Sequence, residues 1–252
     1  MTVNPQRVNV LGVGFDPLTL EQATARIVAF IEAGRPRFVV TPNPEIVYAA
    51  QSDPELMSLL RQADLVAADG TGIVWASGQV GQPVPERVTG VELAESVMAE
   101  AAARKYRLFF LGAKPGVAAE AAARLMGARP GLNVVGVQDG YFTAAEEPAV
   151  LAAIRAASPH LLFVGLGSPR QEKWIKAHQG ELDVPVAIGL GGCFDVWAGH
   201  VPRAPGVFRR LHLEWLYRLG REPRRFWRML ALPKFVLAVR RYGGEPVTLR
   251  RH

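Results

Sequence analysis

The sequence predicts an α/β fold, in which an open, mostly parallel sheet of the Rossmann-like type is flanked by helices and followed by a basic helical C-terminal appendage. Three observations support this: apolar runs short enough for strands, helix-forming segments between them, and a change of composition near residue 200. The chain has 252 residues, of which 49% are hydrophobic and 21% charged. This is enough for a large core and excludes wholesale disorder.

Six apolar runs are the expected strands, and each ends in a glycine, a polar residue or a turn. They are rich in Val, Leu, Ile and Phe and alternate with helical segments, which is typical of parallel strands buried on both faces. Two of the intervening segments, 90–105 and 115–127, have helical spacing and good helix formers. The expected strands are 37–44, 63–70, 106–116, 132–140, 160–169 and 184–192.

Residues 1–200 are therefore interpreted as the α/β core and residues 201–252 as the appendage. Prolines 202 and 205 mark the boundary, and two helices are expected in the appendage, at about 205–219 and 223–242. From Val201 to His252, thirteen Lys or Arg residues are set against three Glu, a net charge of +10, whereas the rest of the chain carries −4. This asymmetry indicates an anionic partner for the appendage alone.

A membrane surface is the anionic partner that the appendage favours, because its basic residues alternate with Phe226, Trp227, Met229 and Leu230. The alternative is a helix that packs on the core and leaves a basic edge in solvent. We expect no nucleic acid partner, since helix-turn-helix and RNP-type motifs are absent and the core is slightly acidic.

The single cysteine, Cys193, permits no intramolecular disulfide and suits a reducing compartment. The N-terminus has no basic segment followed by a long apolar one, so no signal peptide is expected. No apolar run reaches about 20 residues, the length that spans a bilayer. We expect a cytoplasmic protein that is peripheral at the inner face of the cell membrane.

Polar residues that directly follow the expected strands are the candidate site, because ligands of open α/β sheets bind at the carboxyl ends of the strands. Asp69 is the most informative of them: the run "ADLVAADGTG" leads straight to its carboxylate and then to two glycines. A strand-to-helix turn and a catalytic carboxylate both explain this pattern. The candidates are Thr41, Asn43, Asp69, Gly112, Asp139, Tyr141, Gly167, Arg170, Gln171 and Asp195.

Several chemistries lack their motifs. The five histidines show no paired helical spacing and no Cys/His set exists, so no metal site is expected. "GVGFDPL" and "GLGGCF" contain Gly-x-Gly but not the full dinucleotide fingerprint, and no cofactor is expected. Neither a Gly-x-Ser-x-Gly elbow nor a Walker loop is present.

Seven motifs occur in order over residues 41–205: "TPNPEIV", "ADGTGIVW", "ERVTGVEL", "LFFLGAKPG", "DGYF", "GLGSPRQEKW" and "GGCFDVWAGHVPRAP". With them the sequence resembles the WecG/TagA/CpsF family of bacterial glycosyltransferases over nearly the whole chain. The resemblance implies transfer of N-acetylmannosamine, or a related hexose, from a UDP donor to the 4-hydroxyl of N-acetylglucosamine on a polyprenyl diphosphate. It also implies inversion at the anomeric carbon and no need for a metal ion. The polymer would be a cell-envelope polysaccharide or teichoic acid.

The resemblance also implies roles for individual residues. Asp69 resembles the catalytic base, and Arg87 and Gln171 are grouped with it as catalytic residues. Arg87 and Gln171, with Thr41 and Asn43, resemble cleft residues around the donor sugar and diphosphate. Tyr141 and Asp195 resemble residues that face the nucleoside. If the appendage also closes over the site, Arg218, Arg225 and Arg228 would meet a diphosphate. We expect Gly112, Gly167 and Arg170 to contribute to substrate binding from the strand ends.

A different class of function stays open: a non-catalytic module that binds a nucleotide or an anionic surface. The presence of Asp69, Arg87 and Gln171 favours the enzyme, since an arginine can neutralise the leaving diphosphate and a strand-end carboxylate can take a proton. The apolar content permits a homo-oligomer.

Overall fold

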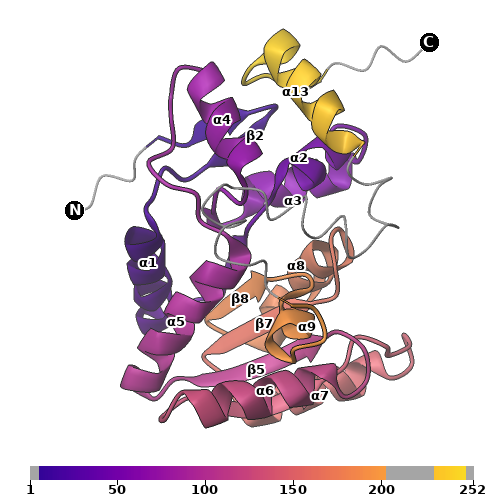
Figure 1. Ribbon diagram of the computed structural model, residues 1–252. Coiled ribbons are helices and arrows are strands. Elements are labelled where there is room, and N and C mark those ends of the chain that lie inside the picture. The colour runs from indigo at the N-terminus through magenta and orange to yellow at the C-terminus, as the bar shows by residue number, and fades with distance from the viewer. Residues whose placement is uncertain (1–5, 203–229, 248–252) are drawn as a thin grey trace.

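The computed structural model describes residues 6–202 and 230–247. Its centre is a six-stranded, wholly parallel sheet in the order β4-β3-β8-β7-β5-β6, so the predicted fold class is confirmed (Figure 1). The six strands lie within the six predicted runs: β3 (Arg37–Val40), β4 (Leu65–Val66), β5 (Arg107–Gly112), β6 (Asn133–Gln138), β7 (Leu161–Gly165) and β8 (Val186–Gly189).

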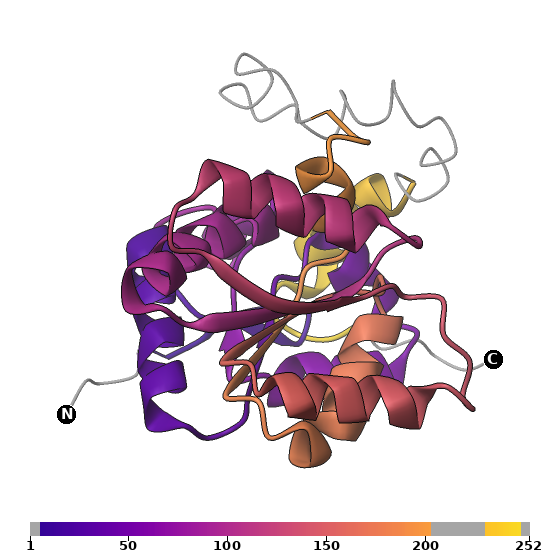
Figure 2. The same ribbon diagram turned by 90° about the horizontal axis from the view of Figure 1, so that it is seen from below.

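Helices cover both faces of this sheet, as the view along it shows (Figure 2). The predicted helices at 90–105 and 115–127 are α5 and α6. The helices are α1 (Leu20–Ala33), α2 (Pro44–Ala49), α3 (Pro54–Gln62), α4 (Thr71–Gln79), α5 (Gly90–Arg104), α6 (Val117–Ala128), α7 (Glu147–Ala157), α8 (Arg170–Leu182), α9 (Cys193–Trp197) and α13 (Ala231–Tyr242).

Side chains alternate between two hydrophobic cores, one on each face of the sheet. In β5, Phe109 and Leu111 join the core under α3, α7 and α8, whereas Leu108 and Phe110 join the core under α1, α5, α6 and α9. Phe110 stacks on Phe163 with ring centroids 5.6 Å apart. Each such buried side chain stabilises the fold by about 1.5–3 kcal/mol. This explains why the runs are apolar throughout rather than at alternate positions.

A two-stranded antiparallel hairpin, β1 (Val8–Val10) and β2 (Val13–Phe15), precedes the sheet and was not predicted. The residue after it, Asp16, is 3% exposed and binds the edge strand β4: its Oδ2 accepts a hydrogen bond from the Val66 N–H at 2.8 Å. Arg7 and Arg26 neutralise the Asp16 carboxylate at 3.0 and 2.8 Å. Strand β4, which leads directly to Asp69, is thus held by a buried, charge-compensated contact.

The end of the chain returns to this same region. Helix α13, the only part of the expected appendage helices within the described ranges, packs on α2 and α4 and buries Phe235, Ala238 and Val239 (Figure 1). Beyond it, the Gly12 N–H donates to the Gly244 carbonyl at 2.8 Å. The expected helix at 205–219 lies outside the described residues, and the division at residue 200 stays a prediction. Within 6–202 and 230–247, no helix has the length and apolar character needed to cross a bilayer.

Candidate active site

A cleft of about 790 Å³ lies at the carboxyl ends of the strands. Loops after β3, β4, β5, β7 and β8 line it, together with the N-terminus of α5 and one side of α13. Seven of the predicted site residues contribute to its wall, although they are spread over more than 150 positions of the sequence. They are Thr41, Asn43, Asp69, Arg87, Gly167, Gln171 and Asp195.

Asp69 follows β4 and faces the first turn of α5. Its Oδ2 accepts a hydrogen bond from the backbone N–H of Gly90 at 3.1 Å, so the carboxylate lies at the positive end of that helix. The two glycines after Asp69 have separate functions. Gly70 has φ +94°, a conformation that favours glycine, and a Cβ on Gly72 would come within 2.6 Å of the Pro44 ring. The run is therefore a turn, and this turn carries a carboxylate into the cleft.

Arg87 lies just before α5, and its side chain is only 16% exposed. Its Nη2 is 3.5 Å from Oε1 of Glu92, while Oε2 of the same carboxylate accepts the Thr89 hydroxyl at 2.8 Å. Thr89 also caps α5 by accepting from the Glu92 N–H. This capping network holds the guanidinium at the same helix terminus that meets Asp69.

Gln171, in the first turn of α8, is 4% exposed and forms hydrogen bonds at both ends of its amide. Its Oε1 accepts from the Gly191 N–H at 2.9 Å, and its Nε2 donates to Oε1 of Glu172 at 2.8 Å. Burial raises the pKa of Glu172, and the hydrogen bond from Gln171 opposes this rise. A Cβ on Gly189 would lie 2.8 Å from Nε2 of Gln171, so this glycine makes room for the amide.

Thr41, Asn43 and Asp195 contribute polar groups to the cleft from three further segments. Asn43 is the N-cap of α2, where its Oδ1 accepts from the Ile46 N–H at 3.0 Å. Thr41 lies close to α5, since a Cβ on Gly90 would come within 2.9 Å of its hydroxyl. Asp195 lies in the first turn of α9. The first turns of α2, α5, α8 and α9 thus converge on the cleft and bring the positive ends of their dipoles to it.

Four predicted site residues do not line the cleft, and one of them, Asp139, accepts the Tyr141 N–H through Oδ1 at 2.8 Å. Arg170 donates from Nη1 to the Gly140 carbonyl at 3.0 Å and lies over the ring of Phe142, so it holds the loop after β6. Tyr141, in that loop, is 68% exposed. Gly112 ends β5 at the point where the connections of the sheet reverse direction, and a Cβ there would come within 2.5 Å of Gly165. Their binding roles stay predictions.

Arg218, Arg225 and Arg228 lie outside the described residues. Conversely, the cleft contains residues that the sequence did not single out, namely Glu45, Lys114, Leu232, Phe235 and Val236. Lys114 could have been found, because it follows β5 in the motif "LGAKPG" at a strand end. No sequence signal places the apolar face of α13 beside Gly72, since that contact depends on tertiary packing. Within the described ranges, no cluster of three or more metal-binding side chains occurs.

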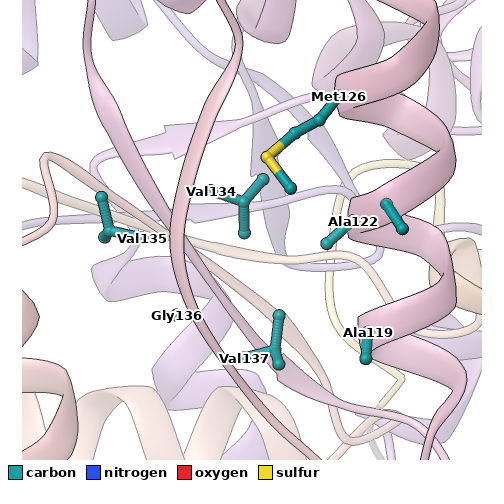
Figure 3. Close-up of a pocket in the computed structure, with 8 residues that line it drawn as sticks. Ala119, Ala122, Met126, Val134, Val135, Gly136 and Val137 are labelled. Carbon is teal, nitrogen blue, oxygen red and sulfur yellow. The ribbon is translucent and has the colours of Figure 1, made fainter.

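A second hollow, of about 250 Å³, has a different chemical character. It lies between α6 and the edge strand β6, where Met126, Ala122 and Ala119 of the helix face Val134 and Val137 (Figure 3). Val134 and Val137 share a face because the register of β6 against β5 shifts at Val135. Only apolar side chains and Gly136 line this hollow, so it offers no side-chain group for acid–base chemistry.

Comparisons with known proteins agree with the geometry. The model of the "Glycosyl transferase WecG/TagA/CpsF family" matches residues 8–246. A protein of Bacillus spizizenii is 40% identical over 83% of this chain and 81% of its own length, and one of Staphylococcus aureus strain MW2 is 35% identical over 94% and 93%. Both are named N-acetylglucosaminyldiphosphoundecaprenol N-acetyl-beta-D-mannosaminyltransferase. The chain therefore belongs to the WecG/TagA/CpsF family of glycosyl transferases and is a hexosyltransferase.

Proposed function

We propose that the protein transfers N-acetylmannosamine, or a closely related hexose, from a UDP donor to the 4-hydroxyl of polyprenyl-diphosphate-linked N-acetylglucosamine. The transfer inverts the anomeric carbon and needs no metal ion. One observation carries the proposal: the Asp69 carboxylate shares a cleft with Arg87 and Gln171, and this cleft lies where α/β sheets bind ligands. The names of the two relatives support the sugar and the acceptor.

Asp69 acts as the general base in this mechanism. The 4-hydroxyl oxygen of the acceptor attacks the anomeric carbon of the donor from the face opposite UDP, while Asp69 takes the hydroxyl proton. A new C–O bond forms as the bond to the UDP oxygen breaks, and the electron pair of that bond leaves with UDP. A positioned base of this kind contributes about 10²- to 10⁴-fold to the rate.

Charge that grows on the leaving diphosphate requires compensation, which two cations in the cleft wall provide. Arg87 offers several fixed N–H donors, and Lys114 adds a point charge from the turn before α6. Helices α6 and α8 both begin without a side-chain cap, which leaves backbone N–H groups for phosphate oxygens. Together these groups neutralise the charge on the leaving diphosphate, which in other glycosyltransferases is neutralised by a divalent cation.

The remaining contacts are assigned from the same reasoning. Thr41, Asn43 and Gln171 contact the donor sugar and diphosphate, and Tyr141 and Asp195 face the nucleoside. In the appendage, Arg218, Arg225 and Arg228 meet a diphosphate when the appendage closes over the cleft. These assignments rest on the motifs and, for the cleft residues, on their shared wall.

The appendage also attaches the enzyme to the inner face of the cell membrane, where a polyprenyl acceptor resides. Helix α13 supports this, because its buried face packs on the core while Leu237 is 65% exposed and Lys234 and Arg240 are exposed near it in sequence. An apolar side chain between basic ones suits the headgroup layer of an anionic membrane.

A transfer assay tests the proposal. The full-length protein is incubated in EDTA with UDP-N-acetylmannosamine and a short-chain polyprenyl diphosphate N-acetylglucosamine, and the product is detected by mass. We expect an acceptor that has gained one N-acetylhexosamine, with UDP released. UDP-N-acetylglucosamine serves as the control donor, since it differs only in the orientation of one substituent.

Absence of product with every UDP-hexose, while UDP still binds, would refute transfer and favour the non-catalytic module. Product that forms only after a divalent cation is added would refute metal independence alone.

A further inference from the structure

Beside the cleft lies a buried carboxylate that the mechanism above does not use. Glu172 is the residue after Gln171 in α8 and is 2% exposed. Its Oε1 accepts the Gln171 amide at 2.8 Å, and its Oε2 is buried with no partner at full hydrogen-bond geometry among the described residues. The Ser168 side chain and the backbone of Glu172 itself add weaker hydrogen-bond interactions to the carboxylate. A buried carboxylate with one oxygen unsatisfied costs free energy, and a neutral side chain of similar size would cost less.

The geometry of Gln171 indicates why a buried carboxylate is present at position 172 despite its cost in free energy. A side-chain amide has an acceptor oxygen and two N–H donors, and it can be turned by 180° with little change in shape. In Gln171 the oxygen faces the Gly191 N–H and the nitrogen faces the Glu172 carboxylate. Only this orientation satisfies both neighbours, because the reverse would bring donor to donor and acceptor to acceptor.

The surroundings of Gln171 limit its other movements. Its backbone N–H donates to the Gly167 carbonyl at 2.9 Å, which fixes the first turn of α8. The amide fills the space that Gly189 leaves by having no Cβ. Once one Nε2–H is bound by Glu172, the second is the remaining donor of the side chain, and Gln171 lines the cleft.

We propose that Glu172 is a positioning residue: its buried carboxylate fixes the Gln171 amide so that the second Nε2–H is presented to an oxygen of the donor sugar or diphosphate. This deepens the proposed function and rests on it. Glu172 itself does not touch substrate. Its contribution is the acceptor oxygen that receives one Nε2–H of Gln171 and so holds the amide in one orientation.

Four variants test this role by the kinetics of transfer: Glu172→Met, Glu172→Gln, Gln171→Ala and the double variant Gln171→Ala/Glu172→Met. Loss of the hydrogen bond in Glu172→Met should lower kcat/KM by about 10- to 100-fold. In Glu172→Gln an acceptor oxygen remains, so kcat/KM should stay within about 3-fold of the wild type. Because both single changes remove the same contact, the double variant should be no worse than Gln171→Ala.

A purely structural role for Glu172 makes the opposite predictions. The losses of the two single variants would then multiply in the double variant, and Glu172→Gln would be as impaired as Glu172→Met. Glu181→Met is the matched control, because Glu181 is an exposed carboxylate at the far end of α8 that pairs with Arg155. It should leave kcat/KM unchanged.

The side-chain NH₂ signals of Gln171 give a readout that does not depend on transfer. In ¹⁵N-labelled protein these signals are assigned by their absence from Gln171→Ala. They should shift in Glu172→Met and stay close to the wild-type positions in Glu172→Gln. Unchanged signals in Glu172→Met would overturn the proposal. If Glu172→Met does not fold, displaced Gln171 signals in Glu172→Gln would overturn it instead.

Failure of the proposed function is distinguishable from failure of this inference. A wild-type protein that transfers no sugar refutes the function, and the NMR comparison then still decides whether Glu172 fixes Gln171. A wild-type protein that transfers sugar while the variants behave additively refutes the inference alone.

Discussion

Two acidic residues at the cleft, Asp69 after β4 and Glu172 in α8, differ in their burial and in the groups that bind their carboxylates. Asp69 lines the cleft and accepts a backbone N–H from the start of α5. Glu172 is buried next to the cleft residue Gln171 and accepts its side-chain amide, and burial raises the pKa of Glu172. The difference teaches that position relative to the cleft, rather than the type of group, is the ground for proposing an acid–base role for Asp69 and a positioning role for Glu172.

The largest effect expected is on turnover when the cleft carboxylate is neutralised. Asp69→Asn should lower kcat by about 10²- to 10⁴-fold, because the amide cannot take the acceptor proton. UDP affinity should change little, and it can be measured by calorimetry beside the transfer assay. Asp183→Asn is the control, since Asp183 is exposed after α8 at φ +52°, where Asn is well tolerated. Unchanged turnover in Asp69→Asn would remove Asp69 from the mechanism.

Loss of the cation beside Asp69 should have the next largest effect. Arg87→Met should lower kcat by about 10²-fold, the usual effect of removing one donor that stabilises developing negative charge. Arg104→Met is the control, because Arg104 lies at the other end of α5 and is 46% exposed. Equal kcat for Arg87→Met and the wild type would assign Arg87 a structural role at the α5 cap.

A substitution at a neighbouring glycine can displace the Gln171 amide while residue 171 remains glutamine. Its expected effect is smaller than that of Arg87→Met. Gly189→Ala adds a Cβ 2.8 Å from Nε2 of Gln171, so the flexible end of that side chain must shift. We expect kcat/KM to fall about 10-fold, the lower end of the loss expected when the hydrogen bond between Gln171 and Glu172 is removed. In Gly180→Ala, the control on α8, the new Cβ meets nothing within 4 Å. Full activity in Gly189→Ala would show that the amide position is not critical.

The smallest effect expected concerns stability and its dependence on pH. Because burial raises the pKa of Glu172 in the folded state, the folded protein binds this proton more tightly than the unfolded chain. The resulting stabilisation is complete below the ordinary pKa of about 4.5 and is lost as the pH rises through the raised value. Glu172→Gln cannot ionise, so its Tm relative to the wild type should increase with pH.

Thermal unfolding followed by circular dichroism at pH 5 and at pH 8 measures this difference. A difference in Tm that does not change with pH would contradict the burial of an ionisable group at this position. The two carboxylates should thus differ in effect: Asp69→Asn lowers turnover, whereas Glu172→Gln changes how the Tm depends on pH.

Most of the fold was predictable from local patterns. Each of the six sheet strands lies within a predicted apolar run, because strands buried on both faces must be apolar at every position. The antiparallel hairpin was missed, since its three-residue strands are too short to show a pattern. Strand β4 has only two residues in the sheet although the run 63–70 is long, because the chain turns early toward Asp69.

The candidate site was predictable in part. Strand-end placement found Thr41, Asp69 and Asp195, which the structure brings together in one cleft. The same reasoning selected Arg170 and Tyr141, which do not line the cleft and whose binding roles stay predictions, because sequence position gives the end of the sheet but not the direction of a side chain. It missed Lys114, and it did not separate Gln171 from the buried Glu172 beside it.

The sequence by itself determined the α/β class, the parallel strands and the motifs that identify the family, because each of these depends on residue types within short segments. Only the tertiary structure decided which strand ends share a cleft, which helix terminus meets Asp69, and that α13 forms one wall. These features depend on strand order and on packing between distant segments, such as Phe235 against Gly72. The physical reason is that hydrophobic periodicity specifies which face of an element is buried, whereas the partner on that face is chosen by the packing of the whole chain.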